Sequence, residues 1–141
     1  MKRLIACAMV VISLFSVSAM PSFAAEIESG ENAIMPCYEY TESVAVSLKI
    51  SKSGTATAKA DLSGYPGTTT GVHIFMYLER EEDGKWVTVE SWSGSASSHS
   101  LAIEEAVEVD SGYTYRVRVS CYAYAGTASE HITKYSQEVD Y

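Results

Sequence analysis

Alternating hydrophobic and polar residues run through most of the chain beyond residue 43, and they indicate β-strands. The first alternating segment places four apolar side chains on one face: Val44, Val46, Leu48 and Ile50. A period of two over this length is typical of a strand that is buried on one side. The pattern recurs in three further segments, whose expected inward residues are Ala56, Ala58, Ala60 and Leu62; Val72, Ile74, Met76 and Leu78; and Val117, Val119, Cys121 and Ala123.

Turn-forming residues separate these segments. Asp83-Gly84 is the strongest signal, because the pair supplies the positive φ angles of a tight hairpin turn. The strand after this turn, to about Trp92, has two alternating faces: Val87 and Val89 on one, and Trp86, Thr88, Glu90 and Trp92 on the other. Either face could be buried, and a β-bulge could bring members of both inside.

The remaining segments complete an all-β pattern. Glycine, proline and serine predict loops at 63–71 and 93–100, and Asp110-Ser111-Gly112 predicts a turn before a long strand at 113–125. A last strand is expected near 131–139. A short strand before the Asp110-Ser111-Gly112 turn is marked by Leu101 and Ile103. Val107 and Val109 could continue this strand after an irregular stretch at 104–106. About seven antiparallel strands without helical periodicity predict an immunoglobulin-like or fibronectin type III-like β-sandwich over residues 42–141.

The N-terminus has the features of a signal peptide. Lys2-Arg3 precede an apolar run at 4–17, which is shorter than the roughly 20 residues that a spanning helix needs. Small residues in Ser22-Phe23-Ala24 predict cleavage after Ala24. We therefore expect residues 1–24 to be removed, residues 25–41 to form a flexible acidic leader, and the chain to be secreted, with no membrane association after cleavage.

Charge narrows the classes of partner. The formal net charge is −8, and the signal peptide holds two of the ten basic residues and none of the eighteen acidic ones. The exported chain is therefore more acidic still. An acidic surface repels nucleic-acid phosphates and anionic membranes, so neither is expected as a partner.

Two cysteines remain after cleavage, Cys37 and Cys121. Export permits a disulfide between them. The alternative is two unpaired thiols, with Cys121 a small buried hydrophobic residue. Their separation does not match the spacing of a zinc site.

The segment Asp110-Ser111-Gly112-Tyr113-Thr114-Tyr115-Arg116-Val117 resembles the approach to strand F in immunoglobulin-like and fibronectin type III domains. A tyrosine at that corner bonds back to nearby backbone. The resemblance implies this role for Tyr115 or Tyr113.

A wider resemblance is to small secreted proteins of unknown function from Gram-positive bacteria. It is carried by the signal peptide and by four motifs: Ile34-Met35-Pro36-Cys37-Tyr38, the segment Leu48 to Ala56, the segment Lys85 to Ser93, and Gly112 to Val117. These motifs form turns and strands. The resemblance implies the fold and export, with no activity and no cofactor.

Catalytic and metal-binding candidates are few. The histidines are His73, His99 and His131, and hydroxyls lie beside His99 at 93–100. A nucleophile needs a base and an orienting acid, and no nucleophile-elbow motif is present. Carboxylates that suit calcium crowd one hairpin tip, but solvated charges are ordinary there: Glu79, Glu81, Glu82 and Asp83. We expect no enzyme activity and no metal; a small hydrolase is the least favoured alternative.

Aromatic residues on strands form the candidate binding site. Outward aromatic side chains can stack on sugar rings or anchor a protein partner. The expected members are Trp86, Trp92, Tyr77, Tyr122 and Tyr124. The alternative is that both tryptophans are core and the tyrosines are β-formers on a half-wet surface. The favoured hypothesis is a secreted, non-enzymatic module that binds an extracellular protein or glycan; the alternative is a structural component that works by assembly.

Overall fold

A computed structural model describes residues 37–141. The predicted signal peptide and most of the predicted leader lie outside these residues. The described part forms one compact unit, Cys37–Tyr141, whose regular structure is entirely β. None of the described residues belongs to a helix of the length and apolarity needed to cross a membrane. The strands are β1 (Thr41–Ile50), β2 (Thr55–Gly64), β3 (Gly71–Glu82), β4 (Lys85–Ala96), β5 (Ser100–Glu108), β6 (Thr114–Ala125), β7 (Ala128–Tyr135) and β8 (Val139–Asp140).

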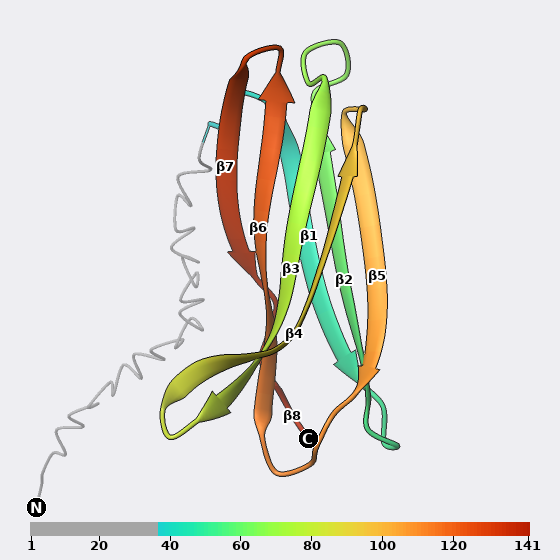
Figure 1. The fold of residues 1–141 in the computed structure, drawn as a ribbon, viewed down its shortest axis with the longest axis vertical. Helices are drawn as coiled ribbons and strands as arrows, with labels where there is room; N and C mark the ends of the chain where they lie inside the picture. Colours follow the sequence, from blue (N-terminus) through green and yellow to red (C-terminus); the bar gives the residue numbers. More distant parts are fainter. Residues whose placement is uncertain (1–36) are drawn as a thin grey trace, which may run out of the picture. The chain divides into compact units, whose positions relative to one another are not determined.

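The strands form two antiparallel sheets that face each other (Figure 1). One sheet has the order β1-β2-β5, and the other has the order β4-β3-β6-β7, with β8 also paired to β6. The predicted β-sandwich is confirmed. In constant-type immunoglobulin domains the fourth strand belongs to the sheet of the first two. Here β4 pairs with β3 in the second sheet, which is the fibronectin type III arrangement.

The core lies between the sheets, where the alternating sequence pattern places it. The inward residues of β2, β3 and β6 are buried, and those of β1 and β5 pack against them. The three buried alanines of β2 would leave gaps if they faced other small residues. Instead the small side chains of Ala56, Ala58 and Ala60 on β2 lie opposite the larger ones of β3 and β6, so the interior is filled.

A β-bulge in β4 decides where the two tryptophans lie. Leu78 pairs with Glu90, but the next residue, Glu79, pairs with Thr88, so Val89 is an extra residue in β4. An extra residue reverses the alternation of faces. Trp92 therefore lies beside Met76 and packs against the core, whereas Trp86 lies on the opposite, outer side. Simple alternation places Trp86 and Trp92 on one face, and the bulge, which the sequence analysis left open, separates them.

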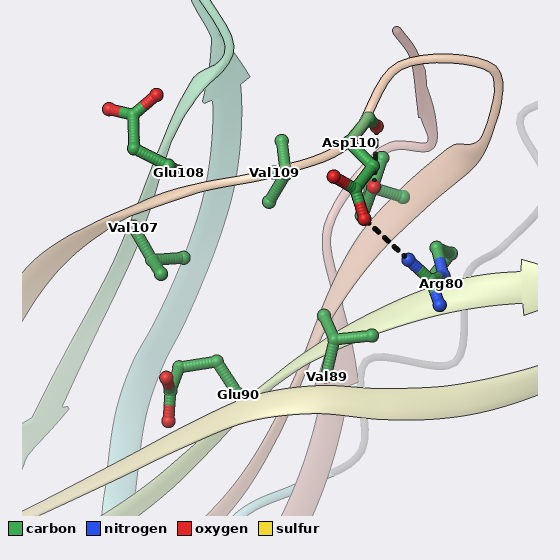
Figure 2. A pocket seen from close by; sticks show the side chains of 8 residues that line it. Arg80, Val89, Glu90, Val107, Glu108, Val109 and Asp110 are labelled. Carbon is green, nitrogen blue, oxygen red and sulfur yellow. Dashed lines mark hydrogen bonds and ion pairs between the residues drawn. The ribbon is translucent and has the colours of Figure 1, made fainter.

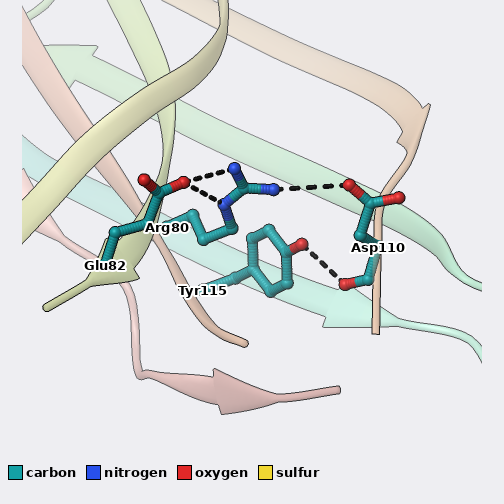
Figure 3. A network of polar contacts seen from close by, with 4 residues as sticks. All are labelled: Arg80, Glu82, Asp110 and Tyr115. Carbon is teal, nitrogen blue, oxygen red and sulfur yellow. Dashed lines mark hydrogen bonds and ion pairs between the residues drawn. The ribbon is translucent and has the colours of Figure 1, made fainter. Parts of the chain in front are cut away.

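The corner before β6 is built around Tyr115, as the fold resemblance implied. Its side chain is buried, and its hydroxyl donates a 2.7 Å hydrogen bond to the carbonyl of Asp110 (Figure 3). Arg80 on β3 pairs with the carboxylates of Asp110 and Glu82, and Glu82 raises the pKa of the Arg80 guanidinium. Tyr113 lies outside, with the Arg80 guanidinium 4.2 Å from its ring centre.

Some strand boundaries differ from the expected ones. β4 continues through the predicted 93–100 loop to Ala96, because its serines and glycine pair in register with β3. β5 has no irregularity at 104–106, since its register with β2 is continuous. The last strand is divided into β7 and β8, and Gln137 between them donates a hydrogen bond to the carbonyl of Leu48.

Candidate functional site

The outer side of the sheet β4-β3-β6-β7 gathers most of the large outward side chains of the described chain. We call it the aromatic face. Strand pairing places its residues in rows: His73, Tyr122 and His131 form one row, and Tyr77, Arg118 and Tyr135 form another. The aromatic face comprises Trp86 on β4; His73, Phe75, Tyr77 and Glu79 on β3; Arg116, Arg118, Ser120, Tyr122 and Tyr124 on β6; and His131 and Tyr135 on β7.

A buried carboxylate organises one half of this face. Glu79 is only 5% exposed, although it lies on the outer side of the sheet. Arg116 Nε donates to one of its carboxylate oxygens at 2.8 Å, and Arg118 Nε donates to the other at 2.7 Å. A buried carboxylate is costly unless charged donors satisfy it, and here both oxygens have such a donor.

Aromatic rings cover the same two guanidinium groups. The Arg116 guanidinium carbon lies 4.0 Å from the ring centre of Trp86 and 4.6 Å from that of Tyr135. The Arg118 guanidinium lies 4.2 Å from the ring centre of Tyr77. These distances are those of cation–π contacts. The carboxylate and the rings together hold both arginine side chains in fixed positions.

The other half of the face is a set of stacked rings. His73 stacks on Phe75 with ring centres 4.2 Å apart, and Tyr122 stacks on His131 at 4.6 Å. Tyr124 lies nearly parallel to Tyr122 but 6.5 Å away, and it is 36% exposed. Most rings of the aromatic face thus already have a neighbour against one side, and Tyr124 and His131 are the exposed rings of this half.

Ser120 and His131 are the one hydroxyl–imidazole pair in the hydrogen bonds of residues 37–141. Ser120 Oγ and His131 Nε2 are 2.6 Å apart. Among the described residues no carboxylate hydrogen-bonds to the other ring nitrogen of His131, and the pair lies on an open sheet. His99, beside the predicted serine-rich loop, precedes β5 and does not join this pair.

Four of the five predicted site residues come together on the aromatic face: Trp86, Tyr77, Tyr122 and Tyr124. Trp92 does not, because of the bulge. Sequence reasoning considered Glu79 only as one of the carboxylates of the hairpin tip, and it did not predict the pairing of Glu79 with Arg116 and Arg118. The sequence signal for this cluster is a glutamate at an outward position of an alternating strand. This signal becomes informative only when the pairing of β3 with β6 is known.

The two cysteines are free thiols in the structure, and the disulfide between them is not formed. Cys37 is exposed, whereas Cys121 is 1% exposed. Burial raises the pKa of Cys121 to about 12. Its thiol is therefore neutral at ordinary pH and a poor nucleophile.

The acidic hairpin tip is divided between separate partners. Glu79 is held by the two arginines, and Glu82 pairs with Arg80. Residues 37–141 contain no group of three or more histidine, cysteine, aspartate or glutamate side chains placed to hold a metal ion.

A cleft of about 210 Å³ opens where β4 turns away from β5 (Figure 2). Val89, Val107 and Val109 line it together with Glu90, whereas the Glu108 carboxylate turns away from the cleft and accepts a 2.7 Å hydrogen bond from Thr55 Oγ1. Asp110 closes one end through its ion pair with Arg80, at 3.4 Å. The cleft follows from the bulge, because the extra residue Val89 carries the far arm of β4 outward.

No protein-family model matches the chain, and no curated protein matches it. Among solved structures, the chain is similar to the solution structure of CsgH from R. palustris, with 10% identity and a TM-score of 0.37, over 70% of this chain and 92% of that one.

Proposed function

We propose that the protein is an exported, non-enzymatic module that binds another protein through its aromatic face. The observation that carries this proposal is the clustering of tyrosine, tryptophan and arginine side chains on one outer face. These residue types are enriched among those that dominate the binding energy of protein interfaces. The signal-peptide features of residues 1–24 support the extracellular setting.

The arrangement of the rings favours a protein over a glycan. A sugar ring stacks on an open aromatic surface, so a glycan site needs ring faces that are free. Here the guanidinium groups or neighbouring rings already cover one side of Trp86, Tyr77, Tyr122 and Tyr135. Tyr135 and Tyr124 keep exposed area beside the guanidinium groups, and this mixture of rings, hydroxyls and charged ends suits the mixed apolar and polar contacts of a protein partner.

Preorganisation supports the same proposal. Binding costs about 0.5–1.5 kcal/mol for each long side chain that must be immobilised. Arg116 and Arg118 are already held by Glu79 and by stacked rings, so little of this cost falls on binding. A rigid patch of this kind resembles the anchor residues of protein interfaces more than a solvated sheet surface.

Site-specific photo-crosslinking in the cells that make the protein tests the proposal. A photoreactive amino acid replaces Tyr124 on the aromatic face, and in a matched variant it replaces Thr57 on the outer side of β2. We expect a discrete crosslinked protein from position 124 and none from position 57. Crosslinks from position 57 alone, or retention on a glycan array that is lost in Tyr124→Ser, would overturn the assignment.

A further inference from the structure

We propose that Arg116 and Arg118 bind two carboxylates of the partner, supplied by an extended segment with acidic side chains at alternate positions. This inference rests on the proposed function and names the chemistry that the aromatic face recognises. It comes from the way in which the two guanidinium groups share a single carboxylate.

The terminal guanidinium nitrogens of Arg116 and Arg118 are available to a partner. Glu79 uses only the Nε atoms, and the terminal nitrogens of both side chains form no hydrogen bond among residues 37–141. The Arg116 and Arg118 side chains are 21% and 30% exposed, and their terminal nitrogens are not among the fully buried unpaired polar atoms of residues 37–141. The two terminal nitrogens of a guanidinium form a planar fork that matches both oxygens of a carboxylate.

The spacing of the forks matches an extended chain. Arg116 and Arg118 are two residues apart on the same side of β6. Residues two apart in a strand lie about 6.6 Å apart, because each residue advances the chain by about 3.3 Å. An extended partner has the same repeat, so acidic residues at alternate positions would meet both forks, whereas adjacent acidic residues would point to opposite sides.

Local charge favours an anion here despite the acidic chain. Within the cluster of Glu79, Arg116 and Arg118 one positive charge is in excess, and Arg118 lies opposite Tyr77, four residues along β3 from Glu81. The other carboxylate of β3 on this side is Glu81, which pairs with Trp86 at the far end. An acidic segment would therefore extend away from Glu81, over Ser120 and toward Tyr122.

Nuclear magnetic resonance titration of residues 25–141 with short synthetic peptides tests the inference. The probe is Thr-Glu-Thr-Glu-Thr. One control keeps the charge but places the glutamates side by side, Thr-Glu-Glu-Thr-Thr, and a second replaces both by glutamine. We expect the alternating acidic peptide to shift the guanidinium signals of both arginines and to bind about threefold to tenfold more tightly than the adjacent one. Equal affinities for the two acidic peptides would overturn the inference.

Three variants distinguish bidentate binding by the guanidinium groups from attraction by their positive charge alone. Arg118→Lys keeps the charge and a partner for Glu79 but lacks the fork, so it should lose the preference for alternating glutamates. Glu81→Gln should tighten binding of the acidic probe, since a nearby like charge is removed. Lys59→Gln, on the other outer face, should change nothing. A preference that persists in Arg118→Lys would contradict the fork.

The outcomes distinguish this inference from the proposed function. If a protein is crosslinked at position 124 but the two acidic peptides bind equally well, carboxylate binding by the two arginines is overturned and the proposed binding face stands. If the alternating acidic peptide binds more tightly but no protein is crosslinked, the proposed function is overturned and carboxylate binding by the two arginines stands. Tighter binding of an oligogalacturonate than of the alternating peptide would overturn the assignment to a protein segment.

Discussion

The two outer faces of the sandwich share the same strand geometry and differ in almost every side chain. The outer face of β1-β2-β5 carries small or singly charged residues and no aromatic ring: Ala45, Ser47, Lys49, Thr55, Thr57, Lys59, Asp61, Ser63, Ser100, Ala102, Glu104, Ala106 and Glu108. The aromatic face carries stacked rings and a buried carboxylate between two arginines. An antiparallel sheet needs only a polar outer side to face water. The first face shows that this requirement is met without large rings.

The fold therefore does not demand the aromatic face. A buried ion pair is weak evidence for stability, because desolvation offsets most of the attraction. The cluster of Glu79, Arg116 and Arg118 is better explained by the fixed surface that it produces.

The largest expected difference between the faces lies in their ion pairs. The double substitution Arg116→Ala and Arg118→Ala leaves Glu79 buried without a charged donor, and it should lower the free energy of unfolding by about 3–5 kcal/mol. Lys59 and Asp61 on the other face are 3.5 Å apart and about half exposed, so Lys59→Ala should cost less than about 0.5 kcal/mol. Urea denaturation measures both, and similar losses would contradict the contrast.

The bulge at Val89 gives the next effect, because it assigns the two tryptophans to opposite sides of one sheet. Trp92→Ala removes a ring that packs against the core and should cost about 2–3 kcal/mol. Trp86→Ala removes a ring stacked on Arg116 and should cost about 1 kcal/mol. Thermal and urea unfolding of the two variants test this order; the reverse order would mean that the bulge is misplaced.

A smaller effect distinguishes the inner and outer tyrosines at the start of β6. Tyr115→Phe loses the hydrogen bond to the Asp110 carbonyl and should cost about 1–2 kcal/mol. Tyr113→Phe is the matched control, because its ring is 37% exposed and its hydroxyl has no hydrogen bond among residues 37–141. We expect the control to unfold at the wild-type urea concentration; equal destabilisation would contradict the role given to Tyr115.

The smallest effect is chemical and leaves stability unchanged. The pKa of Cys121 is about 12 because the thiol is buried, so no thiolate forms near pH 8. In the folded residues 25–141, a thiol-specific chromogenic reagent should label Cys37 quickly and Cys121 only after denaturant is added. Rapid labelling of both thiols in the native state would show that the core is open at β6.

Local alternation predicted the interior well and predicted the aromatic face only in part. The inward residues of β1, β2, β3 and β6 follow directly from a period of two, and Asp83-Gly84 adopts the expected turn, with both residues at positive φ. The bulge depends on the register between two strands, so the positions of Trp86 and Trp92 could not be read from one strand alone. The pairing of Glu79 with Arg116 and Arg118 joins residues that are far apart in the chain, and it appears only when β3 lies beside β6.

The central claim is that the aromatic face recognises a protein while the rest of the surface does not. The most direct test is the affinity of the protein crosslinked at position 124 for the wild type, Tyr124→Ser and Tyr65→Ser. Tyr65 is as exposed as Tyr124, 41% against 36%, but it lies in the loop between β2 and β3. We predict a loss of about tenfold or more for Tyr124→Ser and none for Tyr65→Ser. Unchanged affinity in Tyr124→Ser, or an equal loss in both variants, would contradict the claim.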